Sequence, residues 1–315
     1  MKLQTKIALQ PQKNQIDYSS KVLLLGSCFS DNIGEKIEYF KFQNLVNPFG
    51  IFFHPIAIEK LVTRAINEAF FTEDDIFYYN ERWCCYEVHS ELSEIEKDAY
   101  LKNLNKRLLQ LNEYLKSASH IIFTYGTSWV YRFIETDSIV TNCYKVPQNK
   151  FLKEILSEEE ISASIDNTIT LIKAINPTVN VITTVSPVRH IKDGAIENTR
   201  SKAHLITSLH KEVSTKNRIY YFPSFEIMMD ELRDYRFYNE DLIHPNKTAI
   251  SIIWEAFKNV WIAEETKAIQ KEISTIQTGL QHIPFNSKSE AHELFLNGLK
   301  EKMDALSKRY SHIKF

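Results

Sequence analysis

The chain has 315 residues and a formal net charge of -2; 43% of its residues are hydrophobic and 25% are charged. This is the composition of a globular protein with a sizeable core, and it offers no basic excess to neutralise nucleic-acid phosphates. No apolar run approaches the ~18 residues that a membrane span requires, and residues 1–15 lack the apolar core of a secretory signal. We therefore expect a cytoplasmic protein with neither a nucleic-acid partner nor a membrane span.

The first half of the chain alternates between strand and helix patterns. A short, wholly apolar run at residues 21–26 ends at a glycine and predicts a strand buried on both faces. Residues 31–40 follow with apolar side chains near helical spacing, which gives strand, tight turn and helix. A second amphipathic helix is predicted over residues 55–70, and residues 71–90 form an aromatic, irregular insertion.

The second half continues the alternation. Residues 91–118 place leucines on one face of a predicted helix. Apolar runs at 120–126 and 179–185 predict strands, and residues 161–175 predict the helix between them. A further short strand is expected at 218–222. This order predicts βαβ units and a parallel sheet of about five strands with helices on both faces.

The cysteines predict free thiols. Cys84 and Cys85 are adjacent, Cys28 and Cys143 stand apart, and the sequence has no CxxC pair. This spacing suits neither a disulfide framework nor a zinc site. We expect no metal and no cofactor, and reduced thiols of which at least one is available for chemistry.

Cys28 follows the first predicted strand at the start of a helix. Backbone N–H groups at a helix N-terminus stabilise a thiolate or an oxyanion, so we expect Cys28 to be a nucleophile with a lowered pKa. Two alternatives stay open. Ser27 is the nucleophile and Cys28 is a packing residue, or both residues are structural.

Asp241 and His244 supply the partner that such a nucleophile needs. A histidine requires a carboxylate that fixes its tautomer, and a separation of three lets one loop carry both groups. The alternative is a plain helix start, in which Asn246 caps the helix that follows. Arg189 and His190, after another predicted strand, are candidates for binding an anionic or sugar-like substrate; a solvated surface loop is the alternative.

Several segments in order resemble the GSCFA family, over residues 20–260. They are LLLGSCFSDNIGEKI, NPFGIFFHP, TYGTSWVY, NCYKVPQNKF, TVSPVRHIKDG, SKAHL and YFPSFEIMMDELRDYRFYNEDLIHPN. That family is similar to the SGNH/GDSL hydrolases. The resemblance implies a three-layer αβα, flavodoxin-like fold and esterase-type or acyl-transfer chemistry. We therefore expect an SGNH-like catalytic domain over residues 1–262. The tail beyond it is highly charged and has a helical pattern, which predicts a helical extension over residues 263–315.

The sequence motifs that characterise SGNH hydrolases, called blocks, can be aligned with this sequence. Cys28 falls on the nucleophilic serine and Ser27 on the preceding aspartate, while Asp241 and His244 match the final block unchanged. In the block that includes Gly126, Ser128 replaces the oxyanion asparagine.

The remaining oxyanion block is matched less directly. Gly50 is our candidate for the oxyanion glycine, and Asn47 is a candidate amide donor beside it.

The resemblance implies hydrolysis of an acyl ester on a small molecule or carbohydrate. Two alternatives remain at this stage: an acyltransferase that uses a thioester donor, and a non-catalytic module that binds a carbohydrate or acyl ligand on the same fold. Nothing in the sequence indicates an oligomeric state.

Overall fold

A computed structural model describes residues 4–315. Its central sheet has five strands, all parallel, in the order β10-β9-β5-β1-β2. They are β1 (Lys21–Gly26), β2 (Gln43–Val46), β5 (His120–Tyr125), β9 (Asn180–Val185) and β10 (Ile219–Tyr221). Counted along the chain this order is 2-1-3-4-5, the flavodoxin-like arrangement, with its topological switch point between β1 and β5. The predicted parallel α/β sheet is confirmed.

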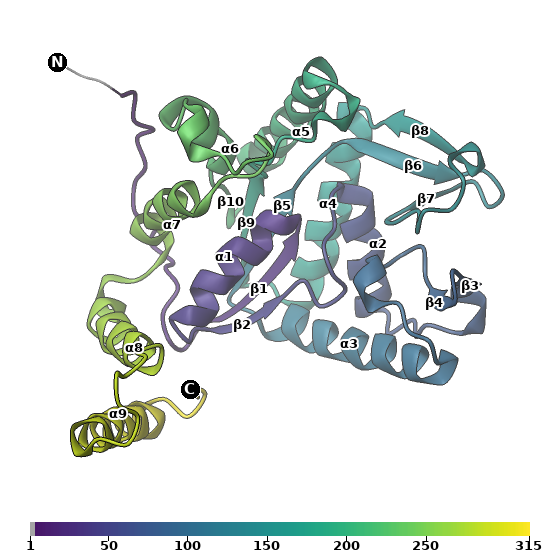
Figure 1. Cartoon of the computed structure of the whole chain (residues 1–315). Coiled ribbons are helices and arrows are strands. Elements are labelled where there is room, and N and C mark those ends of the chain that lie inside the picture. The colour runs from purple at the N-terminus through teal and green to yellow at the C-terminus, as the bar shows by residue number, and fades with distance from the viewer. Residues whose placement is uncertain (1–3) are drawn as a thin grey trace.

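Helices cover both faces of this sheet (Figure 1). One face carries α1 (Cys28–Tyr39) and α7 (Lys247–Trp261). The other carries α2 (Pro55–Ile66), α3 (Lys97–Ser117), α4 (Glu158–Ile175) and α5 (Ala195–Thr215).

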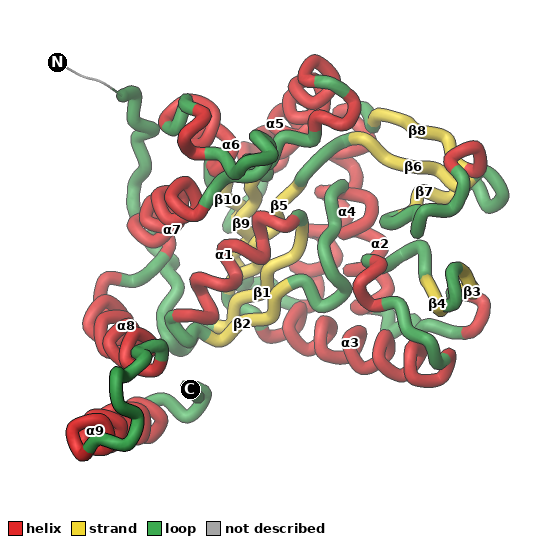
Figure 2. Tube along the Cα trace, in the orientation of Figure 1, coloured by secondary structure: helices red, strands yellow, loops and turns green. Residues whose placement is uncertain are grey.

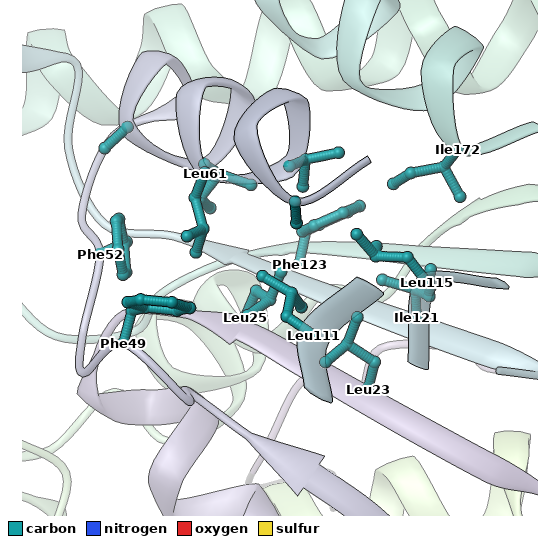
Figure 3. Close-up of a cluster of buried hydrophobic side chains, with 14 of the residues drawn as sticks. Leu23, Leu25, Phe49, Phe52, Leu61, Leu111, Leu115, Ile121, Phe123 and Ile172 are labelled. Carbon is teal, nitrogen blue, oxygen red and sulfur yellow. The ribbon is translucent and has the colours of Figure 1, made fainter. Parts of the chain in front are cut away.

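Strand residues alternate between the two cores because successive side chains point to opposite faces. Leu23 and Leu25 belong to the cluster beneath α2–α5, while Val22 and Leu24 belong to the cluster beneath α1 and α7. Figure 3 shows Leu23 and Leu25 among side chains from the helices above them. A strand buried on both faces has to be apolar throughout, which explains the continuous run in the sequence.

Helix starts follow local capping rules. Ser27 caps α1, and the ring of His54 caps α2 by accepting a hydrogen bond from the Ala57 N–H at 3.2 Å. Pro55 occupies the first turn of α2, where its missing N–H costs nothing. Burial lowers the pKa of His54 to about 4, so this ring is a neutral structural group.

Two small antiparallel sheets lie outside the main sheet and were not predicted (Figure 2). They are the hairpin of β3 (Phe77–Tyr79) and β4 (Arg82–Cys84), and the sheet of β6 (Trp129–Phe133), β7 (Ser138–Val140) and β8 (Phe151–Ile155) in the order β7-β6-β8. Their strands have three to five residues and are only partly buried, so their apolar pattern is too short to read.

The aromatic insertion packs into a satellite core. Tyr86 stacks on Phe77 with ring centroids 4.2 Å apart, and Cys84 and Tyr144 are buried in the same cluster. A small core beneath a long loop explains the aromatic composition of residues 71–90 without any ligand.

The C-terminal segment is helical and packs on the α1 and α7 face. After β10 come α6 (Ser224–Glu226) and a π-helical turn (Ile227–Glu231), and after α7 come α8 (Lys267–Leu280) and α9 (Glu290–Arg309). Ile273 of α8 and Leu306 of α9 are buried in the cluster that includes α1 and α7. Across residues 4–315, no helix is long and apolar enough to cross a membrane.

Adjacent leucines on α3 provide a test of the packing. Leu108 is fully buried and Leu109 is 48% exposed. We expect Leu108→Ala to lower the free energy of unfolding by about 2–5 kcal/mol, because it leaves a cavity under the sheet. Leu109→Ala is the matched control and should change the free energy of unfolding by less than about 0.5 kcal/mol. Urea denaturation measures both, and equal effects would contradict this packing.

Candidate active site

The turn between β1 and α1 depends on a close backbone contact at Gly26. A Cβ atom there would lie 2.2 Å from the carbonyl oxygen of Thr124, and φ is 144°. Only glycine tolerates both conditions. The N–H of Ser27 donates to the same carbonyl at 3.0 Å, so α1 begins at Cys28 directly beside the end of β5.

Asn47 holds this turn from the neighbouring strand end. Its Oδ1 accepts a hydrogen bond from the Gly26 N–H at 2.9 Å, and its Nδ2 donates to Asp31 at 2.6 Å. Asn47 is 8% exposed. It therefore links the end of β1 to α1, which differs from the free amide donor that the sequence suggested.

Asp241 and His244 form a hydrogen-bonded pair. Asp241 Oδ2 lies 2.7 Å from His244 Nδ1, and Asp241 Oδ1 accepts from the N–H groups of Ile243 at 2.9 Å and His244 at 3.0 Å. Hydrogen bonds from the backbone N–H groups of His244 and Ile243 and from the His244 ring lower the pKa of Asp241 to about 2. The cap of α7 is Asn246, so helix initiation does not occupy the His244 ring.

The loop after β9 joins this pair to the sheet edge. The Arg189 N–H donates to the carbonyl of Ile243 at 3.3 Å. His190 packs edge-to-face on Phe53, with centroids 5.3 Å apart, and its buried Nε2 has no hydrogen-bond partner among residues 4–315. Burial lowers the pKa of His190 to about 3, and the neighbouring Lys202 and His244 act in the same direction. His190 is thus a neutral ring.

Lys202 is a site residue that the sequence offered only as a weak candidate for substrate binding, on the helix that follows the Arg189 loop. Its side chain is 1% exposed, and Nζ donates to the carbonyl oxygens of Gly126 at 2.7 Å and Ser186 at 2.8 Å. It therefore ties the end of β5 to the end of β9. Burial lowers the pKa of Lys202 to about 7, while the nearby Cys28 thiolate acts to raise it.

One sequence signal could have found Lys202. It shares the buried face of α5 with Asn198, Leu205 and Leu209, at helical spacing. A lysine in the middle of an otherwise buried stripe is rare unless it is partnered.

The predicted oxyanion donors have other partners. The Gly50 N–H donates to the carbonyl of Asn47 at 2.8 Å, and the Gly126 N–H donates to that of Phe53 at 2.7 Å. Ser128 is fully buried, and its hydroxyl bonds to Ser201 of α5 at 3.0–3.1 Å. The oxyanion roles expected of Gly50, Gly126 and Ser128 do not fit this geometry, because each donor is already used in packing a loop.

The expectation of a lowered pKa at Cys28 is wrong. Burial raises the pKa of Cys28, and the negative charge of Asp31 raises it further. Lys202 and the backbone N–H groups of Cys28 and Phe29 act in the opposite direction but do not prevail. Within residues 4–315, neither Ser27 nor Cys28 is hydrogen-bonded to His244.

We expect Asp31→Asn to move the alkylation profile of Cys28 to lower pH, because it removes the charge that raises the thiol pKa. The measurement is iodoacetamide labelling against pH with peptide mapping. Glu35→Gln, one turn further along α1, is the control and should leave the profile in place. An unchanged profile in Asp31→Asn would show that burial alone sets the thiol pKa.

Residues 21–257 match the GSCFA family, and residues 273–315 match the family described as GSCFA domain protein, C-terminal domain. No curated protein matches the sequence.

The solved structures that it resembles are distant. An acetyl xylan esterase from the rumen bacterium Butyrivibrio proteoclasticus is 8% identical, with a TM-score of 0.43 over 78% of this chain and 65% of that one. A family 3 carbohydrate esterase from Talaromyces cellulolyticus is 8% identical, with a TM-score of 0.37 over 80% and 99% of the two chains. Structural similarity this low gives no information about the activity of this chain. The family match covers well over half of the chain and includes the Cys28 turn and the Asp241–His244 pair, and on that ground the chain belongs to the GSCFA family.

Proposed function

We propose that the protein hydrolyses an acyl ester, with Cys28 as nucleophile, His244 as general base and Asp241 as the group that orients His244. The observation that carries this proposal is the 2.7 Å contact between Asp241 and His244, on a loop that is hydrogen-bonded to Arg189 in the loop after β9. Parallel strands bring their carboxyl ends to one edge, so this loop and the start of α1 share that edge. The resemblance to SGNH/GDSL hydrolases supplies the ester chemistry.

The burial of the two candidate nucleophiles favours Cys28. Ser27 is fully buried, and its hydroxyl accepts a hydrogen bond from the Phe29 N–H at 3.4 Å as the cap of α1. Cys28 is partly exposed. A nucleophile must reach a substrate carbonyl, and of these two residues only Cys28 is partly exposed.

The chemistry then runs in two steps. Asp241 accepts the hydrogen bond from Nδ1–H of His244, which leaves Nε2 free to accept a proton. His244 takes the thiol proton while Cys28 Sγ attacks the acyl carbon, and the ester C–O bond breaks as His244 returns the proton to the alcohol. A water molecule, deprotonated by His244, then attacks the thioester, breaks the C–S bond and restores the thiol.

These steps require the side chains of Cys28 and His244 to approach each other. The side chains of His244 and Asp241 are each 44% exposed, so they have room to move toward the substrate. Catalytic hydrogen bonds are often long or absent in the free enzyme and tighten in the complex.

Charge stabilisation comes from the start of α1 and from Lys202. The first N–H groups of a helix have no acceptor within it, and those of Cys28 and Phe29 lie against the sulfur. We assign oxyanion stabilisation to the Cys28 N–H, in place of Gly50, Gly126 and Ser128. Protonated Lys202 adds a positive charge near the Cys28 sulfur.

We expect His244→Ala and Cys28→Ala each to reduce ester turnover by at least about 100-fold, because each removes a group that moves a proton or forms a bond. The substrates are p-nitrophenyl acetate, acetylated sugars and an acyl-CoA donor, with product analysis to separate hydrolysis from acyl transfer to an alcohol. Ser27→Ala should keep turnover.

The matched control is His282→Ala, which replaces an exposed histidine of the C-terminal segment. The melting temperature of His244→Ala should stay near that of the wild type, since the ring contributes little to either core. Wild-type protein that turns over none of these substrates, but binds them, would establish a binding module instead.

A further inference from the structure

A cavity of about 660 Å³ adjoins the candidate active site. Thr127, after β5, and His190, after β9, line it together with residues 53–54, β6, β7, β8, the loop at residues 141–148 and residues 192–193. Strand β5 is the direct neighbour of β1, at a spacing of about 4.8 Å. The cavity therefore lies at the same carboxyl edge of the sheet as the start of α1, where Cys28 is the first residue.

Aromatic side chains form one wall of the cavity. Phe53, Trp129 and Tyr131 line it and are each partly exposed. The Lys153 ammonium lies over the rings of Trp129 and Tyr131, 5.0 and 5.8 Å from their centroids, so a ligand can use only the other faces of those two rings. Flat, partly exposed rings beside polar groups suit a sugar, because the C–H faces of a pyranose pack on aromatic surface while its hydroxyls bind polar side chains.

The charges of the cavity are unbalanced. Lys145, Lys153, Lys192 and Asp193 line it. Lys153 is paired with Asp193, an ion pair that joins β8 to the segment after β9. In residues 4–315, Lys145 and Lys192 have no carboxylate partner within 4.0 Å. Two cations therefore remain for a ligand.

The histidines of the wall do not change this balance. Burial lowers the pKa of His54 to about 4 and that of His190 to about 3, so both rings are neutral near pH 7. The net charge that faces a ligand is accordingly positive.

The loop that carries Lys145 is held in one conformation. Tyr144 and Lys145 both have positive φ, at 51° and 59°. The Tyr144 hydroxyl donates to the carbonyl of Val88 at 2.8 Å, and its N–H donates to Asn142 Oδ1 at 2.8 Å. Successive left-handed residues are unfavourable and persist where the surroundings hold them, as in ligand clamps.

We propose that this cavity binds the alcohol portion of the ester substrate and that this portion is a negatively charged carbohydrate, carrying a carboxylate or a phosphate. This proposal rests on the proposed function, because it places the ester bond between the cavity and Cys28. The aromatic wall takes the sugar ring, and Lys145 and Lys192 take the negative charge.

Titration calorimetry on Cys28→Ala protein tests this without turnover. The probes are glucuronate, glucose 6-phosphate and glucose, which share a ring and differ in charge. We expect one or both charged sugars to bind about tenfold tighter than glucose, and the stronger of the two identifies carboxylate or phosphate as the charged group. Lys192→Met and Lys145→Met should each weaken the charged sugar about threefold to fivefold and leave glucose unchanged.

The matched control is Lys150→Met, since Lys150 is an exposed lysine near the same loop that does not line the cavity. Equal binding of all three sugars, no binding of any, or equal losses in Lys150→Met and Lys192→Met would each overturn the cavity assignment. Ester turnover by the wild type is measured separately. Charged-sugar binding without turnover would support the ligand class and reject the proposed function.

Discussion

The contact between Gly26 and the carbonyl of Thr124 sets the geometry on which the candidate site depends. Strands β1 and β5 meet there at the topological switch point, and a side chain would force them apart. The same carbonyl accepts the Ser27 N–H, which turns the chain into α1 with Cys28 as its first residue. Asn47 secures this turn from the adjacent strand end. A single steric constraint thus brings a thiol, a helix N-terminus and two strand ends together.

Opposing charges around Cys28 give the site its electrostatic character. Asp31 raises the pKa of the thiol and Lys202 lowers it. Lys202 has a pKa lowered from 10.5 to about 7, so the folded protein loses stability relative to the unfolded chain as pH falls from about 10.5 toward 7. Residues with strongly shifted pKa values cluster at functional sites, and the buried Lys202 beside the Cys28 thiol is a residue of this kind.

The additions to the main sheet have a separate role. The antiparallel sheet of β6–β8 and the hairpin of β3 and β4 share a satellite core, which is built from rings such as Phe77, Tyr86 and Tyr144. That core holds the outer wall of the cavity over the ends of β5 and β9. The flavodoxin-like sheet thus positions the candidate catalytic residues, and the additions define the cavity at the same edge of the sheet.

The sequence alone determined the parts of the protein that depend on local pattern. Mostly apolar runs identified β1, β5 and β9, because strands buried on both faces consist largely of hydrophobic residues. The spacing of three identified Asp241 and His244, since one short loop can hold both groups. Only the tertiary structure showed that Lys202 donates hydrogen bonds to the carbonyl oxygens of Gly126 and Ser186. It also showed that the Ser128 hydroxyl is hydrogen-bonded to Ser201. It also reversed the expected pKa shift of Cys28, because burial and Asp31 outweigh the helix N-terminus. These features arise from contacts between residues far apart in the chain, or from burial that no single segment encodes. The short, half-exposed strands β3, β4 and β7 could not be predicted either, because three residues are too few to show an alternation of apolar and polar side chains.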